Sequence, residues 1–459
     1  MPPAESADRA PALGGDNAHA QRREALLKAV EANRGAVRGL RKDTSNLFRD
    51  PSHVAGHRLD VRGFNHVLAV DPLEKWIDAE GMTTYEDLVA ASLLHRLLPP
   101  VVPELKTITL GGAAAGVGIE ASSFRYGLVH ETLIEIDVLA GGGRIVTCRP
   151  DNEHSDLFFG FPNSYGTLGY ALRLRTAAIA ARPFVELTHR RYTSAVSCFD
   201  AVAEECRGGA DFVDGVVFGA GEFYLNTGRF VETAPWVSDY TFENIYYRSI
   251  PAREIDYLSA GDFIWRWDTD WFWCSKNVGA QIPWIRRLYG RKRLGSRTYQ
   301  RVMRFNSRWG ITSALDRLRG GHTESVIQDV DIPIASAPEF VEWFQREIGI
   351  LPIWICPLIG SAAAGRFPLY PLQPGALYIN FGFWDVVRRQ TRYAPHHFNR
   401  LVEDKVGALG GIKSLYSESF YERDVFDRIY GGDTYRALKA KYDPDGEFPQ
   451  LFDKCVTRR

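Results

Sequence analysis

Apolar residues in the first part of the chain recur with the spacings of short helices and strands. One helical stripe predicts a surface helix over residues 21–37: Leu26, Leu27, Val30 and Val37. Another predicts a helix over residues 84–97 that ends before Pro99: Leu88, Ala91, Leu94 and Leu97. Residues 57–70 contain short β-like pieces, and residues 133–139 have the composition of a strand. This part predicts a mixed α+β domain with few long helices.

The pattern changes near Pro183, where longer strand-like stretches begin. Strands are expected over residues 185–192, 215–218 and 223–226, with a helix over residues 195–206. The second half repeats the theme, with a helix over residues 338–348 and a strand over residues 351–357. Such strand–helix–strand units suit a second domain built on one antiparallel sheet.

Length and composition limit the protein class. A chain of 459 residues is expected to form two to three domains, and 45% hydrophobic with 24% charged residues is typical of a globular protein. No stretch approaches the roughly 18 apolar residues of a membrane span. Residues 1–20 lack the apolar core of a signal peptide, so we expect a cytoplasmic protein. No cysteine or histidine spacing predicts a metal site.

Residues 106–127, K-T-I-T-L-G-G-A-A-A-G-V-G-I-E-A-S-S-F-R-Y-G, place four glycines within eight positions: Gly111, Gly112, Gly116 and Gly118. Glycine lacks a Cβ, so main-chain N–H groups can approach a bound group closely. Successive N–H groups in such a loop form a concave site for phosphate. The segment therefore predicts a loop that holds a phosphate-bearing cofactor.

A Rossmann fingerprint is one interpretation of this loop, because Gly116-Val-Gly118-Ile-Glu-Ala121 matches G-x-G-x-x-A and Asp137 follows about twenty residues later. That fingerprint must open a helix. The residues after Gly118 instead show little helical periodicity and meet a second helix breaker at Gly127. The context therefore argues against a Rossmann fold.

A longer ordered series of motifs surrounds the loop. G-G-x-x-x-G-x-G-I-E-x-S-S is followed by Arg125-Tyr-Gly-Leu128, the predicted strand 133–139, Ser155-Asp-Leu-Phe158 and Gly166-Thr-Leu-Gly169. This series resembles the FAD-binding domain of the vanillyl-alcohol-oxidase type, also called the p-cresol-methylhydroxylase type. Within that superfamily the chain is most similar to the Δ24-sterol reductase family and its bacterial 10-methylene-fatty-acyl reductase relatives. The likeness covers roughly residues 35–459.

The resemblance implies an α+β fold in which a two-subdomain FAD-binding fold of the p-cresol-methylhydroxylase type carries an α+β substrate (cap) domain with an antiparallel sheet. We expect a disordered tail over residues 1–20 and the FAD-binding domain over residues 21–182. The substrate domain is expected over residues 183–415, with a basic–aromatic segment at 271–315. The C-terminal segment, 416–459, is expected to return to the FAD domain.

The resemblance also implies which residues hold FAD, with the pyrophosphate clamped between two loops. The second loop and the turn that closes over the nucleotide contribute Thr109, Gly111, Gly112, Gly116, Gly118, Ile119, Glu120, Ser122, Ser123, Tyr126, Gly127, Gly166, Thr167 and Gly169. The first loop is assigned to Arg41, Lys42, Thr44, Ser45 and Asn46. Covalent members attach FAD through a histidine in that first loop. None lies between residues 41 and 52, so we expect noncovalent FAD.

The family reaction is the reduction of an isolated carbon–carbon double bond with NADPH as electron donor, although the chain has no separate NADPH motif. Protonation before hydride transfer would give a tertiary carbocation-like centre, which needs aromatic faces and a nearby acid. Residues 262–273 have both, so the expected substrate contacts are Trp265, Trp267, Trp271 and Trp273. Asp268 or Asp270 is the expected proton donor, with Tyr416 and Glu418 as rivals. In the alternative interpretation these tryptophans belong to the core, and the aspartates pair with basic residues.

Between Asp270 and Asp316 the chain has no acidic residue, while arginine, lysine and aromatic residues recur throughout, on a protein of formal charge −1. This composition suits peripheral contact with an anionic membrane surface at the inner face of the membrane. A solvated basic face over core aromatics is the alternative. No recognition motif indicates nucleic acid.

The lipid substrate is ranked by the same resemblance. The first choice is a 10-methylene-stearoyl phospholipid, reduced to the 10-methyl (tuberculostearoyl) chain, with the methylene-forming methyltransferase as functional partner. A Δ24-sterol-type or other isoprenoid alkene is second. A flavin oxidase of an alcohol or sugar, and a membrane-associated binding protein without catalysis, are alternatives from other classes.

Overall fold

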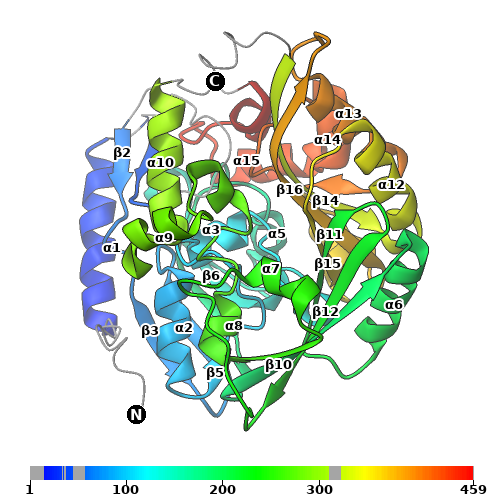
Figure 1. Cartoon of the computed structure of the whole chain (residues 1–459). Helices are drawn as coiled ribbons and strands as arrows, with labels where there is room; N and C mark the ends of the chain where they lie inside the picture. The colour runs from blue at the N-terminus through cyan, green and yellow to red at the C-terminus, as the bar shows by residue number, and fades with distance from the viewer. Residues whose placement is uncertain (1–14, 34, 36–37, 45–56, 310–321, 458–459) are drawn as a thin grey trace.

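The computed structural model describes residues 15–33, 35, 38–44, 57–309 and 322–457. Two antiparallel sheets and the helices around them dominate this part of the chain (Figure 1). Two-stranded sheets are added by the parallel pair β1 (Arg38–Arg41) and β2 (His57–Asp60) and the antiparallel pair β5 (Leu97–Leu98) and β9 (Ile179–Ala180). The α+β class with antiparallel sheets is confirmed, whereas the specific subdomain arrangement stays a prediction.

The first large sheet has five strands, all from the N-terminal part of the chain. Their order across the sheet is β3 (Val67–Asp71), β4 (Trp76–Glu80), β8 (Tyr170–Ala177), β6 (Leu133–Leu139) and β7 (Ile145–Cys148). Helix α1 (Asp16–Glu31) buries Leu26 and Val30 in a cluster with Leu139 and Leu172 of this sheet. Helix α1, dark blue in Figure 1, thus covers one face of this sheet.

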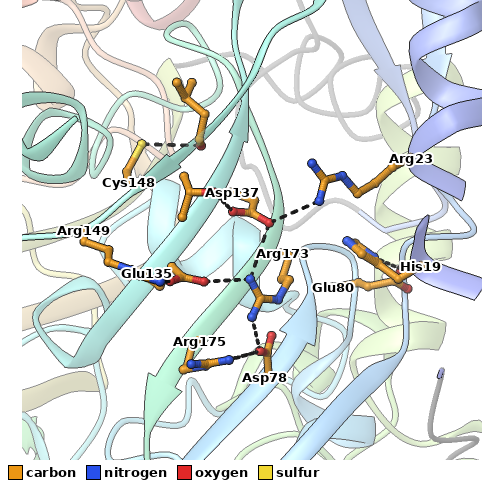
Figure 2. Close-up of polar contacts among 12 residues, drawn as sticks. His19, Arg23, Asp78, Glu80, Glu135, Asp137, Cys148, Arg149, Arg173 and Arg175 are labelled. Atoms are coloured by element: carbon orange, nitrogen blue, oxygen red, sulfur yellow. Dashed lines mark hydrogen bonds and ion pairs between the residues drawn. The ribbon is translucent and has the colours of Figure 1, made fainter. Parts of the chain in front are cut away.

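Charged side chains on three neighbouring strands form ion pairs on the face of the sheet that α1 covers (Figure 2). Arg173 on β8 pairs with Asp78 on β4 and, at 2.7 Å, with Glu135 on β6. Asp137 lies 3.5 Å from Arg173 and accepts a 2.6 Å hydrogen bond from Thr147. The Rossmann interpretation needed Asp137 for a ribose, and the structure gives it to this ion-pair network instead.

The second large sheet has eight strands, and every neighbouring pair is antiparallel. In spatial order they are β13 (Ile255–Ser259), β10 (Phe184–Tyr192), β12 (Glu222–Val231), β11 (Phe212–Gly219), β15 (Ile353–Ile359), β16 (Leu377–Arg389), β14 (His322–Pro333) and β17 (Ile412–Lys413). Three helices pack together on its outer face, at the right of Figure 1: α6 (Ala195–Arg207), α12 (Ala337–Glu347) and α13 (His397–Ala408).

Alternation along the central strands decides which side chains face inward. On β15, Ile353 and Ile355 join the outer core beneath the helices, while Trp354 belongs to the inner core. On β14, Val326 and Val330 face outward, so Asp329 and Asp331 lie on the inner face. The inner face packs against the first part of the chain, and the functional cavity lies there.

The remaining helices connect or close these two units. They are α2 (Tyr85–Leu93), α3 (Leu110–Ala115), α4 (Ser123–Tyr126), α5 (Ser155–Gly160), α7 (Tyr246–Ser249), α8 (Ala260–Ile264), α9 (Pro283–Tyr289), α10 (Ser296–Trp309), α14 (Arg423–Ile429) and α15 (Gly432–Tyr442). Helix α15 contacts α5, and Lys439 donates to the carbonyl of Thr167 at 2.7 Å. The C-terminal segment therefore contacts the N-terminal part of the chain.

Two predicted helices differ from the structure. The helix expected over 84–97 is α2, which ends at Leu93; Leu94 is 75% exposed and Leu97 lies in β5. The helix expected over 21–37 is α1, which begins at Asp16, inside the expected tail, and ends at Glu31. Residues 1–14 of that tail lie outside the described residues. None of the helices in the described part of the chain is long and apolar enough to cross a membrane.

Candidate functional site

A cavity of about 600 Å³ lies between the glycine segment and the inner face of the eight-stranded sheet. That volume is in the range of small-molecule and cofactor sites. Its lining combines glycines, Lys42 and Arg58 from the N-terminal part with Lys454 and with aromatic and acidic side chains from the second half. The cavity therefore joins two chemically different walls.

The glycine wall is built around α3. Thr109 caps this helix, since its hydroxyl oxygen accepts from the N–H of Gly112 at 3.1 Å. The N–H of Gly111 donates to the carbonyl of Gly81 at 2.9 Å, so both glycine amides are used within the protein. In the described part of the chain, the N–H groups of Val117 and Ile119 have no such partner, and both residues line the cavity. These amides are available to a bound phosphate.

Unusual backbone conformations gather at this cavity. Among the described non-glycine residues with positive φ, four line it: Val117, Tyr165, Trp271 and Phe272. Gly166 and Gly169, with φ of +77° and +132°, lie in the same lining. Backbone held in sparsely populated regions is concentrated at ligand sites. This clustering supports a binding role for the cavity.

Three basic residues line the cavity: Lys42, Arg58 and Lys454. Lys454 also donates to the carbonyl of Tyr165 at 2.6 Å, which fixes its ammonium beside the positive-φ turn. Cations next to amides freed by glycine-rich backbone suit a pyrophosphate.

The opposite wall is aromatic. The rings of Phe272 and Trp384 lie 4.4 Å apart between centroids, and Phe272 also meets Trp354 at 5.5 Å. All three residues line the cavity, as does Trp271. This wall offers aromatic faces to an apolar ligand.

Two carboxyl groups, two residues apart on β14, also line the cavity, and their surroundings differ. Asp331 accepts from the hydroxyl of Tyr370 at 2.6 Å and from the amide of Asn380 at 2.7 Å. Burial raises its pKa to about 6, against the effect of these two hydrogen bonds. Burial, with repulsion from Asp331, raises the pKa of Asp329 to about 8 despite a hydrogen bond with Tyr416. Asp329 is therefore protonated at neutral pH.

A second group of buried charges touches the cavity through Glu104. Arg266 lies 2.7 Å from Asp214, 3.1 Å from Glu104 and 3.2 Å from Glu120. Burial, together with the charge of Glu120, raises the pKa of Glu104 well above its usual range. One guanidinium thus holds three carboxyl groups.

Many of the predicted cofactor residues do line the cavity: Lys42, Thr44, Thr109, Gly111, Gly112, Gly116, Gly118, Ile119, Gly166 and Gly169. The others named in the glycine segment and its closing turn do not: Glu120, Ser122, Ser123, Tyr126, Gly127 and Thr167. Glu120 pairs with Arg266, and the hydroxyl of Ser122 donates to the carbonyl of Pro100 at 2.7 Å. Arg41 lies on β1 outside the lining, and Ser45 and Asn46 lie outside the described residues.

The predicted proton donors separate into two groups. Tyr416 lines the cavity and accepts from the indole N–H of Trp384 at 2.8 Å. Asp268, Asp270 and Glu418 are not in the lining. Asp270 is held by both terminal nitrogens of Arg286, at 2.6 and 2.9 Å, which matches the alternative interpretation of a salt bridge to the basic stretch.

Asp268 has a comparable structural environment. It accepts from the hydroxyl of Ser296 at 2.6 Å and from the main-chain N–H of Lys106 at 2.9 Å. Of the four predicted substrate tryptophans, Trp271 lines the cavity, whereas Trp265, Trp267 and Trp273 do not. Trp267 and Trp273 are fully buried core residues.

Sequence reasoning missed two cations of the first wall, Arg58 and Lys454. It also missed much of the second wall: Phe272, Asp329, Asp331, Trp354, Tyr370, Asn380 and Trp384. One signal was available. In the stretch Gln328-Asp-Val-Asp-Ile-Pro333, carboxylates alternate with aliphatic residues, which places both aspartates on the face opposite a buried apolar one. Two acids on the inner face of a strand mark a candidate site.

Comparisons with known proteins agree with this geometry. Residues 18–149 match the family of the FAD binding domain. The chain is 27% identical over 410 residues to "Delta(24)-sterol reductase" of Homo sapiens, covering 86% of this chain and 77% of that protein. The "Delta(24)-sterol reductase" of Arabidopsis thaliana is 23% identical over 444 residues, which cover 87% of this chain and 77% of that protein. "Cytokinin dehydrogenase 7" of Oryza sativa subsp. japonica is 32% identical over 148 residues, 31% of this chain and 28% of that one.

These findings confirm the resemblance seen in the sequence: residues 18–149 match the FAD binding domain, and the chain is similar over most of its length to proteins named Delta(24)-sterol reductase. The residues present fit FAD. The matched range contains the glycine wall with its two unpartnered amides, together with Lys42 and Arg58.

Proposed function

We propose that this protein is an FAD-dependent reductase of an isolated carbon–carbon double bond in a lipid, with NADPH as electron donor. The substrate ranked first is a 10-methylene-stearoyl phospholipid, reduced to the 10-methyl chain. The observation that carries the proposal is the single cavity in which a glycine-rich, cationic wall faces an aromatic wall with a protonated carboxyl group. Relatedness to Delta(24)-sterol reductases supports the class of reaction.

Each wall has a separate task. The amides of Val117 and Ile119, with Lys42, Arg58 and Lys454, would hold the pyrophosphate. When bound, FAD would supply the hydride of the reaction after its own reduction by NADPH. The rings of Phe272, Trp354 and Trp384 exclude water and present π faces to positive charge that develops on the substrate. The double bond is unactivated, so the protein must also hold a proton ready.

The aromatic wall favours a lipid over a sugar. A sugar oxidase would need several side chains to hydrogen bond hydroxyl groups, whereas Trp271, Phe272, Trp354 and Trp384 offer this cavity mainly carbon surface. A Δ24-sterol-type or other isoprenoid alkene is the second candidate, because it also gives a tertiary centre on protonation. Similarity to proteins named Delta(24)-sterol reductase supports this candidate.

Anaerobic spectroscopy tests the class of reaction. Purified protein should be yellow from noncovalent FAD, and NADPH should bleach it without oxygen. Added alkene lipid should then restore the colour. Rapid reoxidation by air after reduction by a sugar or alcohol would instead favour an oxidase. A colourless, folded protein that ignores added FAD would exclude the whole proposal.

Lipid analysis tests the substrate. A host that makes 10-methylene-stearoyl lipids through a methyltransferase should convert them to 10-methyl chains when it also expresses this protein. Persistent 10-methylene chains together with active reduction of a Δ24-sterol-type alkene would favour the second candidate.

We also propose peripheral contact with an anionic membrane surface. Around α9, Ile282, Trp284 and Leu288 are 45%, 64% and 71% exposed, and Lys292 and Arg293 lie exposed just beyond the helix. Exposed apolar side chains beside basic ones are typical of a segment that binds a membrane interface. Such contact would bring the enzyme to its lipid substrate.

A further inference from the structure

We infer that Asp329, which lines the cavity on β14 between Tyr416 and Asp331, is the residue that donates the proton to the substrate double bond. This inference rests on the proposed function and assigns one of its steps to a residue outside the aspartate-rich stretch 262–270.

The position of Asp329 follows from strand register. Across β15, β16 and β14, Trp354 pairs with Gly382, and Gly382 pairs with Asp329. A Cβ on Gly382 would lie 2.7 Å from the Oδ1 atom of Asp329 and 2.5 Å from the Trp384 ring. The missing side chain therefore leaves room for the carboxyl group and the indole to lie together on the inner face of the sheet.

The hydrogen bonds of the two aspartates are unequal. Both oxygens of Asp331 accept from neutral donors, Tyr370 and Asn380, which stabilises the ionised form. The Oδ1 atom of Asp329 is buried and has no hydrogen-bond partner in the described part of the chain. An unpartnered buried carboxylate oxygen is unfavourable, and a second negative charge beside Asp331 adds repulsion. The proton of the pair therefore resides on Asp329.

The other titratable groups around Asp329 are consistent with a proton on its carboxyl group. Asp331 lies on the same strand, Tyr416 follows β17, and Tyr370 and Tyr165 come from loops. Burial raises the pKa of Tyr370 and Tyr416 well above their usual range, so both stay neutral. Lys413 on β17 is engaged with Glu403 at 2.7 Å. Glu104, Cys274 and Lys454 also line the cavity, and Glu104 is the rival acid.

The step balances as follows. The π electrons of the alkene take the proton of Asp329, so a C–H bond forms at the methylene carbon while the O–H bond breaks. The tertiary carbon is left electron-poor, and the hydride that bound, reduced FAD would supply to it would complete the saturated chain. The Asp329 carboxylate regains a proton from solvent. Trp384 and Phe272 line the same cavity as Asp329 and would present π faces to the transient positive charge.

The test separates the two half-reactions. In Asp329→Asn, anaerobic reduction of the flavin by NADPH should stay within twofold of the wild type. Reoxidation by 10-methylene-stearoyl phosphatidylglycerol in detergent should slow by about 100-fold or more, the usual range for loss of a general acid. Asp329→Glu should restore part of the rate. The wild-type rate should fall as the pH rises through about 8, and the Asn variant should lose this dependence.

Asp385→Asn is the matched control. Asp385 lies on the neighbouring strand β16, pairs with Lys276 at 2.7 Å and does not line the cavity, so both half-reactions should be unchanged. Normal reoxidation in Asp329→Asn, or a loss that follows Glu104→Gln instead, would overturn the assignment while leaving the proposed function intact. A wild type that reduces neither the 10-methylene lipid nor a Δ24-type alkene would overturn both.

A spectroscopic readout is independent of turnover and of folding defects that reduce activity. Infrared difference spectra between pH 7 and pH 9 should show the C=O band of a protonated carboxyl group that disappears at the higher pH. The band should be absent in Asp329→Asn and present in Asp385→Asn. Its retention in Asp329→Asn would show that the titrating proton belongs to another residue and would contradict the inference.

Discussion

Gly169 has a φ of +132°, and a Cβ at this position would lie 2.6 Å from the carbonyl oxygen of Leu139. Two independent requirements, backbone conformation and close strand contact, therefore select glycine. The motif Gly166-Thr-Leu-Gly169 indicated this turn from sequence alone. Alternation along its strand was the local signal for Asp329, but its role also depends on pairing with residues such as Gly382 that are far along the chain.

Gly169→Ala is expected to destabilise the protein by more than the roughly 1–2 kcal/mol of an unfavourable φ, because the new methyl group also collides with main-chain atoms. Gly142→Ala is the matched control: its φ is +67°, yet nothing lies within 4 Å of an added Cβ. Denaturant unfolding of both variants measures the difference. Equal losses would show that the contact with Leu139 relaxes at no cost.

Asp329 also makes a prediction about stability against pH. Its pKa is about 8 in the folded chain and about 3.9 when unfolded, so the folded state keeps a proton that the unfolded state loses in between. The free energy of unfolding should therefore fall as the pH rises from about 4 to about 8, by at most about 1.4 kcal/mol per pH unit from this group. Asp329→Asn removes that contribution.

Denaturant titrations at a series of pH values test this. The stability of Asp329→Asn relative to the wild type should increase from pH 4 to pH 8 and level off above pH 8. A difference that does not vary with pH would mean that Asp329 ionises normally in the folded protein. Asp331 titrates in both proteins, so its ionisation contributes equally to both and cancels in the difference.

At the scale of elements, the accuracy of the predicted ends did not depend on the type of element. The helix expected over 195–206 is α6 with one residue added, whereas the strand expected over 223–226 is β12, which extends from Glu222 to Val231. Strand 133–139 coincides with β6, and the expected strand 185–192 is β10 with one residue added. Helix α2 was expected to be longer because Leu94 and Leu97 continued its apolar spacing, but Leu97 pairs with Ala180 in a small sheet. Such long-range pairing overrides local periodicity. The chain's charge pattern likewise gave no indication of the network across β4, β8 and β6.

The loss of unfolding free energy in Arg173→Ala should measure how much that network stabilises the five-stranded sheet. The substitution leaves Asp78, Glu135 and Asp137 without their shared partner, and breaking a buried ion pair typically costs about 3–5 kcal/mol. Arg149→Ala is the control: it also removes a partner of Glu135, but its side chain is 53% exposed, so the loss should stay near or below about 1 kcal/mol.

Low pH should reduce the difference in unfolding free energy between Arg173→Ala and Arg149→Ala. Burial alone would raise the pKa of Glu135, yet hydrogen bonds from Arg149 and Arg173 lower it overall. The stability that this carboxylate contributes is therefore present at neutral pH and lost as the pH falls through its depressed pKa. Thermal unfolding at pH 7 and at pH 3 measures both effects. A difference that stays constant at low pH would contradict an ionic origin.

At the scale of the whole molecule, the cavity is formed by two segments that sequence reasoning treated separately. The FAD loops were located from their motifs, since glycine spacing is local. The substrate wall was assigned to residues 265–273 on composition, and of the predicted tryptophans the structure places Trp271 in the cavity. Strands β14, β15 and β16 contribute five lining residues to that wall, Asp329, Asp331, Trp354, Asn380 and Trp384. No local pattern could reveal the order of these strands across the sheet.

The surface around α9 carries the last prediction, because exposed Trp284 and Leu288 lie beside the exposed cations Lys292 and Arg293. Replacing both apolar residues by serine should weaken binding to phosphatidylglycerol vesicles at least tenfold, since burial of each side chain contributes about 1.5–3 kcal/mol. Binding should also weaken with added salt and be poor on phosphatidylcholine. Trp236→Ser is the control, because Trp236 is 50% exposed outside this segment. Sedimentation with vesicles measures the binding of each variant under each condition. Equal binding by the double variant and the wild type would exclude α9 as the contact surface.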